Sequence, residues 1–377
     1  MKIAILASNF IRLPPEPQFV PKGYSGAPEK IMWLITENLI KKGHEVTLFA
    51  SGDSKTNAKL ISVTEKSTSL FLLEKTEKRI DYENFLISKC YEMARKGQFD
   101  IIHSIFDVRS AFYAKFVSTP TVSTLHSPLT GHKKTILENF KKDQYYVSIS
   151  NAQRKPIPDL NYIATIYHGI DLKNNNFTFN SKGGNYMLFV GRLVPEKGIK
   201  QIISIAKKFQ KKTYLLGTGL EESDFWNIDV KLNIDNKLIY QIGFLPQEEL
   251  TKYYQNSKLF LFPIQWEEPF GLVMIESMAC GTPIVAFARG SVPEVIKDGE
   301  TGFIVNPSDD DIRGDFIIKK TGIEGLCDAV EKIYSMPEDQ YRKMRRACRE
   351  HVEKNFTVEK MVDAYEKVYE EILSIKK

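Results

Sequence analysis

Short apolar runs alternate with helical patterns along the whole chain. Runs such as KIAILAS (2–8) and EVTLFAS (45–51) are apolar at nearly every position, on both faces of an extended segment. Such runs are typical of strands buried on both sides, as in a parallel sheet covered by helices. The other strands expected in the first half of the chain are residues 99–104, 120–126, 145–150 and 162–169.

Helical patterns lie between these runs. In residues 28–43, apolar side chains recur at helical spacing, Pro28 suits the first turn, and Gly43 suits the C-terminal stop. The last pattern, residues 358–377, carries one apolar stripe and is long enough to pack back on the first domain. That stripe consists of Val358, Met361, Val362, Tyr365, Val368 and Ile372.

The composition changes at residues 171–184, where DLKNNNFTFNSKGG is poor in apolar residues and is the expected linker. The alternation then restarts. Two successive series of this kind predict an α/β fold of two facing Rossmann-like domains. We expect an N-terminal domain of residues 1–172, completed by a crossing-back helix at 357–377, and a C-terminal domain of residues 184–356. The strands expected in the second domain are residues 185–192, 212–219, 237–245, 257–264, 282–288 and 301–307.

Composition and charge narrow the class of protein. The 42% hydrophobic and 26% charged residues are typical of a globular protein, and no run approaches the roughly 18 apolar residues of a membrane span. Four scattered cysteines without metal-ligand spacing favour a reducing compartment, so the expected location is the cytoplasm. Residues 1–170 hold 23 Lys/Arg against 16 Asp/Glu, a difference of +7. This excess fits a solvated basic face, an anionic acceptor or peripheral contact with the inner face of the membrane; nucleic-acid binding is not expected.

Candidate chemistry follows the strands, because ligands of such sheets bind outside the carboxyl ends of the strands. Gly26 opens the first helix, where free N–H groups and the helix dipole suit a phosphate. Arg192 and Lys197, on the loop after the first strand of the second domain, suit a diphosphate. The alternative for Gly26 is a plain turn into a helix. The alternative for Arg192 and Lys197 is two exposed basic side chains at a turn. The chain has no GxGxxG, which disfavours a nicotinamide dehydrogenase.

Two carboxylates in EEPFGLVMIE (267–276) are eight residues apart. On one helix, Glu268 and Glu276 would be separated by about 12 Å. Paired glycosidase carboxylates lie about 5 to 9.5 Å apart, so a hydrolytic pair is disfavoured. Pro269 predicts a helix start near 269–271, with Glu268 in the preceding loop. We therefore expect the two acids to bind different hydroxyls of one elongated ligand.

Together these segments resemble a known family. SGAPEK, TLHSP, VGRLVPEKG, GFLPQEEL and the block that begins EEPFGLVMIE are similar to the motifs of the retaining glycosyltransferases of family 4, which have the GT-B fold. The resemblance extends from residue 1 to about residue 310.

The resemblance implies a role for each matching position. Arg192 and Lys197 would bind the donor diphosphate, Glu276 the ribose hydroxyls, and Glu268 the hydroxyls of the transferred sugar. His126 would lie beside the reacting sugar. The remaining donor contacts would come from Gly26, Phe244, Leu245, Phe270, Gly271 and Leu272.

The implied activity is transfer of a sugar from a nucleotide-diphospho-sugar, with UDP-sugars first and GDP-mannose second, to the hydroxyl of an unidentified acceptor in glycan or glycoconjugate synthesis. No metal cofactor is expected, and Asp309–Asp311 are interpreted as a solvated turn. His103 and Asp107 are further candidates for the acceptor side. The alternatives are a nucleotide-sugar epimerase or glycan phosphorylase on the same fold, and a non-catalytic nucleotide-sugar binder.

Overall fold

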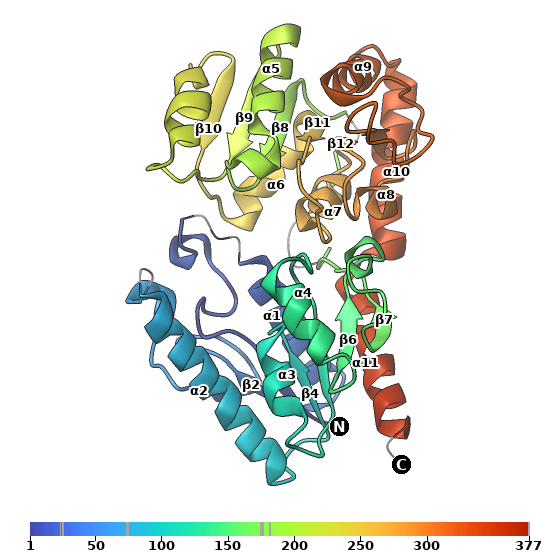
Figure 1. Cartoon of the computed structure of the whole chain (residues 1–377). Helices are drawn as coiled ribbons and strands as arrows, with labels where there is room; N and C mark the ends of the chain where they lie inside the picture. Colours follow the sequence, from blue (N-terminus) through green and yellow to red (C-terminus); the bar gives the residue numbers. More distant parts are fainter. Residues whose placement is uncertain (23, 25, 73–74, 174–176, 181, 376–377) are drawn as a thin grey trace. The chain divides into compact units, whose positions relative to one another are not determined.

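The computed structural model describes residues 1–22, 24, 26–72, 75–173, 177–180, 182–375 of the chain. It divides into two compact units, each built around one parallel sheet (Figure 1). Unit 1 comprises Met1–Pro21, Gly26–Gly169 and Val358–Lys377, and unit 2 comprises Lys22–Ser25 and Ile170–Thr357. The expected linker, residues 171–184, includes positions 174–176 and 181, which lie outside the described residues. Among the described helices, none is both long and apolar enough to cross a membrane.

Unit 1 has a seven-stranded parallel sheet in the order β3-β2-β1-β4-β5-β6-β7. The strands are β1 (Lys2–Leu6), β2 (Glu45–Phe49), β3 (Lys59–Ile61), β4 (Ile101–Ser104), β5 (Thr121–Thr124), β6 (Tyr145–Ser148) and β7 (Tyr162–Thr165). The helices are α1 (Ala27–Lys41), α2 (Thr76–Arg95), α3 (Arg109–Ala114), α4 (His132–Asn139) and α11 (Val358–Ile375), with 3-10 turns η1 (Pro17–Phe19), η2 (Thr68–Leu70) and η3 (Ala152–Arg154).

Unit 2 has a six-stranded parallel sheet in the order β10-β9-β8-β11-β12-β13. The strands are β8 (Tyr186–Val190), β9 (Thr213–Leu216), β10 (Ile239–Ile242), β11 (Ser257–Phe262), β12 (Ile284–Phe287) and β13 (Gly302–Val305). The helices are α5 (Ile199–Phe209), α6 (Gln247–Gln255), α7 (Leu272–Ala279), α8 (Val292–Val295), α9 (Gly322–Tyr334) and α10 (Glu338–Asn355), with the short turns η4 (Pro195–Lys197), η5 (Phe225–Val230, π-helical) and η6 (Lys231–Asn233).

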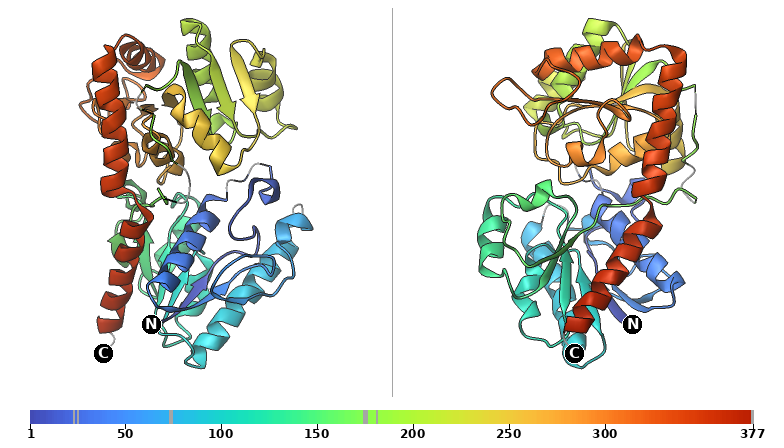
Figure 2. Two further views of the ribbon diagram at one scale, coloured as in Figure 1. Left: turned by 180° about the vertical axis from the view of Figure 1, so that it is seen from behind. Right: turned by 90° about the vertical axis from the view of Figure 1, so that its right-hand side faces the viewer.

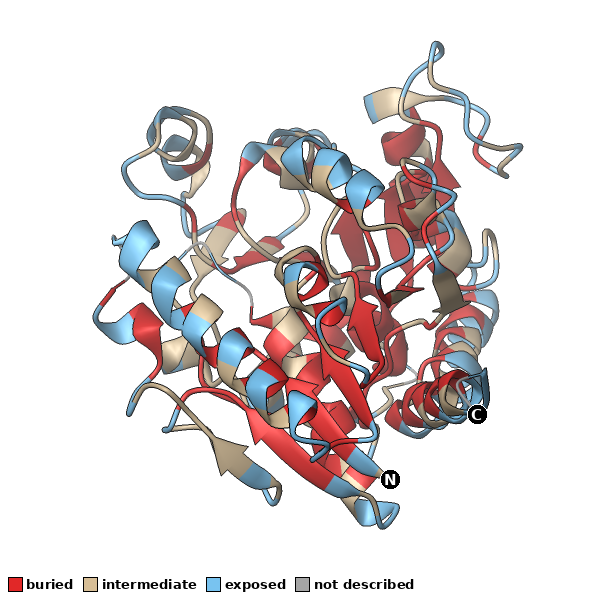
Figure 3. Ribbon diagram, turned by 60° about the horizontal axis from the view of Figure 1, so that its bottom comes forward, coloured by how far each residue is buried: buried red, intermediate tan, exposed pale blue. Residues whose placement is uncertain are grey.

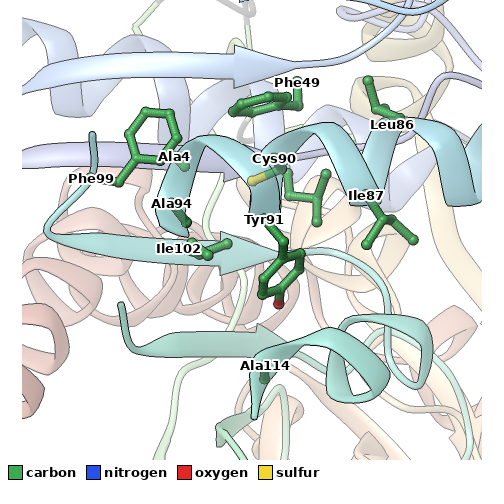
Figure 4. Packing of buried hydrophobic residues seen from close by; sticks show 11 residues of the cluster. Ala4, Phe49, Leu86, Ile87, Cys90, Tyr91, Ala94, Phe99, Ile102 and Ala114 are labelled. Atoms are coloured by element: carbon green, nitrogen blue, oxygen red, sulfur yellow. The ribbon is translucent and has the colours of Figure 1, made fainter. Parts of the chain in front are cut away.

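The expected fold class is confirmed, and the reason lies in the strands. Ile3, Ala4, Ile5 and Leu6 of β1 are all fully buried, so neither face of that strand meets water. Figure 3 shows the central strands as buried ribbon and the helices as partly exposed. On one face, α2 packs its apolar stripe on the sheet, where Leu86, Ile87 and Cys90 meet Phe49 and neighbouring side chains (Figure 4). Every strand predicted from an apolar run is present; the short β3, which has only partly buried residues, was not predicted.

The C-terminal helix α11 belongs to unit 1, where it lies beside α1 (Figure 2). All six residues of its predicted apolar stripe are buried. Its Tyr369 hydroxyl lies 2.6 Å from Nδ1 of His103, and Nε2 of that ring lies 2.7 Å from Thr124 Oγ1. His103 is therefore wholly interior, which corrects the expectation that it faces an acceptor. Burial lowers the pKa of His103 to about 3, so the ring is neutral at physiological pH.

One buried cation ties several segments of unit 2 together. Arg345, on α10, is fully buried and has no carboxylate partner among the described residues. Its guanidinium donates instead to the carbonyls at the end of α6 (Gln255), the start of β11 (Ser257) and the end of α7 (Cys280), at 3.0 to 3.2 Å. A further bond of 2.7 Å goes to the Asn180 carbonyl. Arg345 therefore fixes where α7 ends.

We expect Arg345→Met to lower the free energy of unfolding of unit 2 by about 3 kcal/mol or more, because each carbonyl left buried without a donor costs about 1–3 kcal/mol. The measurement is the midpoint of urea unfolding. Arg342→Ala is the control, since Arg342 lies on the same helix but is exposed and pairs with Glu338; its effect should stay within about 0.5 kcal/mol. Equal midpoints for the two variants would contradict the role of Arg345.

Candidate functional site

The strand order in unit 2 reverses next to β8, so the chain leaves β8 and β11 in opposite directions along the sheet. In open parallel sheets, this reversal opens a crevice at the carboxyl ends of the two strands. Arg192 and Lys197 follow β8, and Glu268 follows β11. Figure 1 shows β8 and β11 side by side. The topology therefore brings side chains that are more than 70 positions apart in the sequence to one point.

The loop after β8 is pressed against the loop after β11. Gly198 has a φ of +74°, and a Cβ at this position would lie 2.0 Å from the carbonyl oxygen of Pro263. The N–H of Gln265 donates to the Glu196 carbonyl at 2.8 Å. Only glycine allows this close approach. As a result η4 is fixed in place, with Lys197 as its last residue.

Lys197 and Glu268 form a shielded ion pair. Nζ of Lys197 lies 2.7 Å from Oε2 of Glu268, and the two side chains are only 12% and 11% exposed. The indole N–H of Trp266 donates to the same carboxylate oxygen at 2.9 Å. The Lys197 ammonium also lies 4.5 Å from the centre of the Trp266 ring, within cation–π range. Arg192 is more exposed and lies 3.3 Å from Glu196.

The second carboxylate of the motif lies in a different environment. Helix α7 begins at Leu272 with Gly271 as its N-cap in the left-handed region (φ 79°), so Glu268 lies in the preceding loop as expected. Glu276 is buried in the middle of α7, and the Tyr254 hydroxyl lies 3.3 Å from its carboxylate. The two acids thus have separate partners. Phe270 is buried, and its carbonyl accepts a bond of 2.8 Å from the Ser291 hydroxyl.

The other predicted residues of unit 2 and the N-terminal loop lie at strand ends or helix starts. Phe244 and Leu245 follow β10 and are half-buried. Gly26 is the N-cap of α1 with a φ of +63°, and a Cβ there would lie 2.9 Å from Cβ of Pro15. Gly26 lies in unit 1, whereas the Arg192 and Lys197 loop lies in unit 2.

In unit 1, His126 follows β5 and is held by Asp107, which follows β4. The Asp107 carboxylate accepts from the His126 backbone N–H at 3.0 Å and from Lys133 Nζ at 2.8 Å. The His126 ring stacks on His168 with 5.3 Å between ring centres, and its Nε2 is buried without a hydrogen-bond partner among the described residues. Burial lowers the pKa of His126 to about 4, against the opposing effect of the Asp107 charge. The imidazole is therefore neutral at pH 7.

Several residues of these regions were not singled out from the sequence. Glu267 accepts from the Gly290 N–H at 2.7 Å and pairs with Arg313 at 2.7 Å, which ties the segment after β13 to the motif that contains Glu268. Of the acids 309–311, which were expected in a solvated turn, Asp311 pairs with Arg313 and Asp309 accepts from Thr321. Among the described residues, no group of three or more His, Cys, Asp or Glu is arranged to hold a metal ion. The opposite charges within residues 306–321 were the only hint of these ion pairs in the sequence. Sequence alone does not show which acid pairs with Arg313.

One further acid was also missed. Glu29 lies in the first turn of α1, three residues after Gly26, and it is buried. Burial raises the pKa of its carboxyl to about 7. A carboxyl group with this pKa is half protonated near neutral pH. Because strongly shifted pKa values are frequent at functional sites, Glu29 makes the start of α1 a candidate for such a site.

Two family models match the chain, and they divide it almost where the two units divide it. The model described as Glycosyltransferase Family 4 matches residues 29–174, and the model described as Glycosyl transferases group 1 matches residues 172–354. Together the two matches include every element from α1 to most of α10.

Individual relatives and solved structures that match most of the chain include sugar-transferring or sugar-nucleotide-binding proteins. N-acetyl-alpha-D-glucosaminyl L-malate synthase of Bacillus anthracis is 24% identical over 89% of this chain and 92% of its own length. Among solved structures, sucrose-phosphate synthase of Thermosynechococcus elongatus superposes over 100% of both chains with a TM-score of 0.74 and 18% identity. Anabaena HepE in complex with UDP-glucose superposes over 99% of this chain and 100% of its own, with a TM-score of 0.69 and 17% identity. At these identities, the solved structures establish the likeness of the fold.

The neutral histidines of unit 1 predict that its stability falls as the pH is lowered from about 6.5 toward about 4. In the unfolded chain a histidine protonates near 6.5, whereas His126 protonates only near 4 in the folded chain. The unfolded state thus binds more protons in this window, and stability rises with pH by up to about 1.4 kcal/mol per pH unit for one such group.

The measurement is the urea midpoint between pH 7 and pH 4.5 for the natural chain and for His126→Phe. Carboxyl groups remote from position 126 titrate alike in both, so the difference reports the imidazole together with the groups it acts on, Asp107, His103 and His168. His126→Phe should show a shallower dependence on pH. Parallel curves for the two proteins would contradict the neutral state of His126.

Proposed function

The chain belongs to family 4 of the glycosyltransferases, with the GT-B fold, and from this membership we propose that it is a retaining hexosyltransferase. The donor we propose is a nucleotide-diphospho-sugar, a UDP-sugar first and GDP-mannose second. The acceptor is the hydroxyl of a molecule in cell-surface glycan or glycoconjugate synthesis. The similarity to HepE, solved with UDP-glucose, supports the choice of a uridine donor.

The observation that carries this proposal is the Lys197–Glu268 pair at the strand-order reversal of unit 2. In a nucleotide-diphospho-sugar, the anionic diphosphate is bonded directly to a sugar that carries hydroxyl groups. The Lys197 ammonium suits the diphosphate, and the Glu268 carboxylate, 2.7 Å away, accepts hydrogen bonds from hydroxyls. Trp266 shields both charges from water on one side, which strengthens their effect on a bound ligand.

Transfer would proceed with retention and without a nucleophile from the protein. The bond between the anomeric carbon and the diphosphate oxygen breaks, and the acceptor oxygen bonds to the same face of that carbon. The acceptor proton passes to an oxygen of the departing diphosphate. Arg192 and Lys197 would stabilise the negative charge that develops on the diphosphate, which is the part a metal ion has in other transferases. No metal is needed for this scheme.

The remaining residues would bind the two ends of the donor and the reacting sugar. Glu276 would accept from the ribose hydroxyls, and the backbone of Phe244 and Leu245 would contact the base. Phe270, Gly271 and Leu272 would place backbone groups against sugar and phosphate at the start of α7, where the helix dipole favours an anion. In unit 1, Gly26 would approach a phosphate. The neutral His126 would accept or donate a hydrogen bond at the transferred sugar.

A cognate donor should raise the melting temperature of the chain. A ligand that binds only the folded state stabilises it by mass action, by about 2.7 kcal/mol at a hundredfold excess over Kd. Thermal-shift measurements with UDP-, GDP- and ADP-sugars test this, with free glucose as the control ligand. The UDP-sugar set should give the largest shift. If no nucleotide-sugar shifts the melting temperature, the proposed reaction is wrong.

The two carboxylates should differ in their kinetic effects. Glu276→Gln should mainly raise the KM for the donor, and Glu268→Gln should mainly lower kcat. Either effect should be about tenfold to a hundredfold, the value of about 1.5–3 kcal/mol for a hydrogen bond to a charged group.

Initial rates at varied donor concentration separate the two parameters. Glu324→Gln is the control, because this exposed glutamate lies on α9, away from the β8–β11 loops. Equal changes in KM for Glu268→Gln and Glu276→Gln would show that the roles are assigned wrongly.

A further inference from the structure

Unit 1 has a hollow at the edge of its sheet where the strands begin, opposite the edge where the strands end and where His126 and Asp107 lie. Its volume is about 320 Å³, and it opens at the amino ends of β5 and β6, where Thr121 and Tyr145 begin the two strands. His126 and Asp107 follow the carboxyl ends of strands in the same sheet. The hollow is therefore separate from the proposed transfer site, and the proposed function leaves it without a role.

Two cations at this hollow have no acidic partner. Lys115 and Lys142 line it and are exposed, and neither forms an ion pair with a described residue. The adjacent Lys141, by contrast, pairs with Asp159. Asp143 is the single carboxylate among the lining residues, so the lining carries one net positive charge. Unpaired lysines around a hollow attract an anion of matching size.

The hollow also has a buried polar group without a partner. Gln144 is only 3% exposed, and neither atom of its side-chain amide has a hydrogen-bond partner among the described residues. The Gln144 amide interacts with the Tyr146 hydroxyl outside hydrogen-bond geometry, and that hydroxyl donates to the Phe140 carbonyl at 2.9 Å. Thr121, another lining residue, is already bonded to the Tyr91 hydroxyl. Because a buried amide without hydrogen bonds is destabilising, a ligand that pairs with Gln144 would offset that cost.

These groups specify the chemistry of a ligand. Lys115 and Lys142 donate to an anion such as a phosphate, and the NH₂ of Gln144 can donate to the same group. The amide oxygen of Gln144 needs a donor, which a hydroxyl next to the phosphate would supply. We propose that this hollow binds a phosphate ester that carries a neighbouring hydroxyl, as in a glycerophosphate group.

Exposed aromatic rings beside the hollow favour a lipid headgroup over a free metabolite as the source of that group. Phe116 is 69% exposed and Phe112 is 39% exposed. Nζ of Lys115 lies 5.4 Å from the Phe116 ring centre and 5.5 Å from that of Phe140. Aromatic rings together with lysines are typical of surfaces that contact the headgroup region of an anionic membrane. The net positive charge of residues 1–170 would also be attracted to an anionic membrane.

The test uses the full chain and two probes: glycerol 3-phosphate, titrated by calorimetry, and vesicles of phosphatidylglycerol mixed with phosphatidylcholine, measured by cosedimentation. We expect both probes to bind. Lys115→Ala/Lys142→Ala and, separately, Gln144→Leu should each weaken binding of both by about tenfold or more, or about 1.4 kcal/mol. The control is Lys78→Ala/Lys96→Ala, which removes the same charge from exposed positions on α2 and at its C-cap and should leave the affinities within about twofold.

The outcomes separate the sources and the alternatives. Binding of glycerol 3-phosphate without vesicle binding supports the pocket and overturns the lipid source. An equal loss in the control variant overturns the pocket, because it would show non-specific attraction by charge. Absence of binding to both probes overturns the proposal whatever the transferase assays show. Gln144→Leu should keep its melting temperature, since an apolar side chain there removes a buried amide without a partner, so lost binding would not reflect unfolding.

Discussion

Parallel pairing of every strand is the constraint on which the rest of this structure depends. A parallel connection must cross the sheet, so each strand of a unit ends at the same edge and each loop after a strand starts there. At the point where the strand order reverses, neighbouring loops diverge and leave room for a ligand. In unit 2 this point lies between β8 and β11, and the residues after these strands include Lys197 and Glu268.

The Lys197–Glu268 pair is a weak source of folding stability, and the function we propose gives it a role in binding the donor. Burying two charges carries a desolvation cost that mutual attraction repays only in part, so such pairs are weak contributors to folding. Much of the surrounding structure nevertheless serves to hold this one. Gly198 allows the η4 turn to approach Pro263, and Trp266 donates to the carboxylate. Further away, Arg345 caps the end of the helix that carries Glu276. These contacts fix the positions of the two charges, which the proposed function assigns to the donor.

Apolar patterning predicted the strands and helices well because burial on both faces of a strand leaves a continuous apolar run. The short β3, with only partly buried residues, has no such run and was missed. A lone polar residue was harder to interpret. His103 and His126 both stand at or after strand ends, yet one is packed against Tyr369 of α11 and the other stacks on His168. Their contacts come from segments far apart in the chain, which periodicity does not relate. The roles proposed for the site residues remain predictions.

The sequence by itself determined the fold class, the family resemblance and the separation of Glu268 from Glu276, because these depend on local periodicity, motif spacing and the rise of a helix. Only the tertiary structure decided which side chains form ion pairs and hydrogen bonds with one another. Glu267 pairs with Arg313 across 46 positions, Arg345 has carbonyls in place of a carboxylate, and Gln144 is buried beside two unpaired lysines. The physical reason is that hydrogen bonds and ion pairs act over a few ångströms in space. Which groups come that close is set by how the elements pack, and the order of residues alone does not contain it.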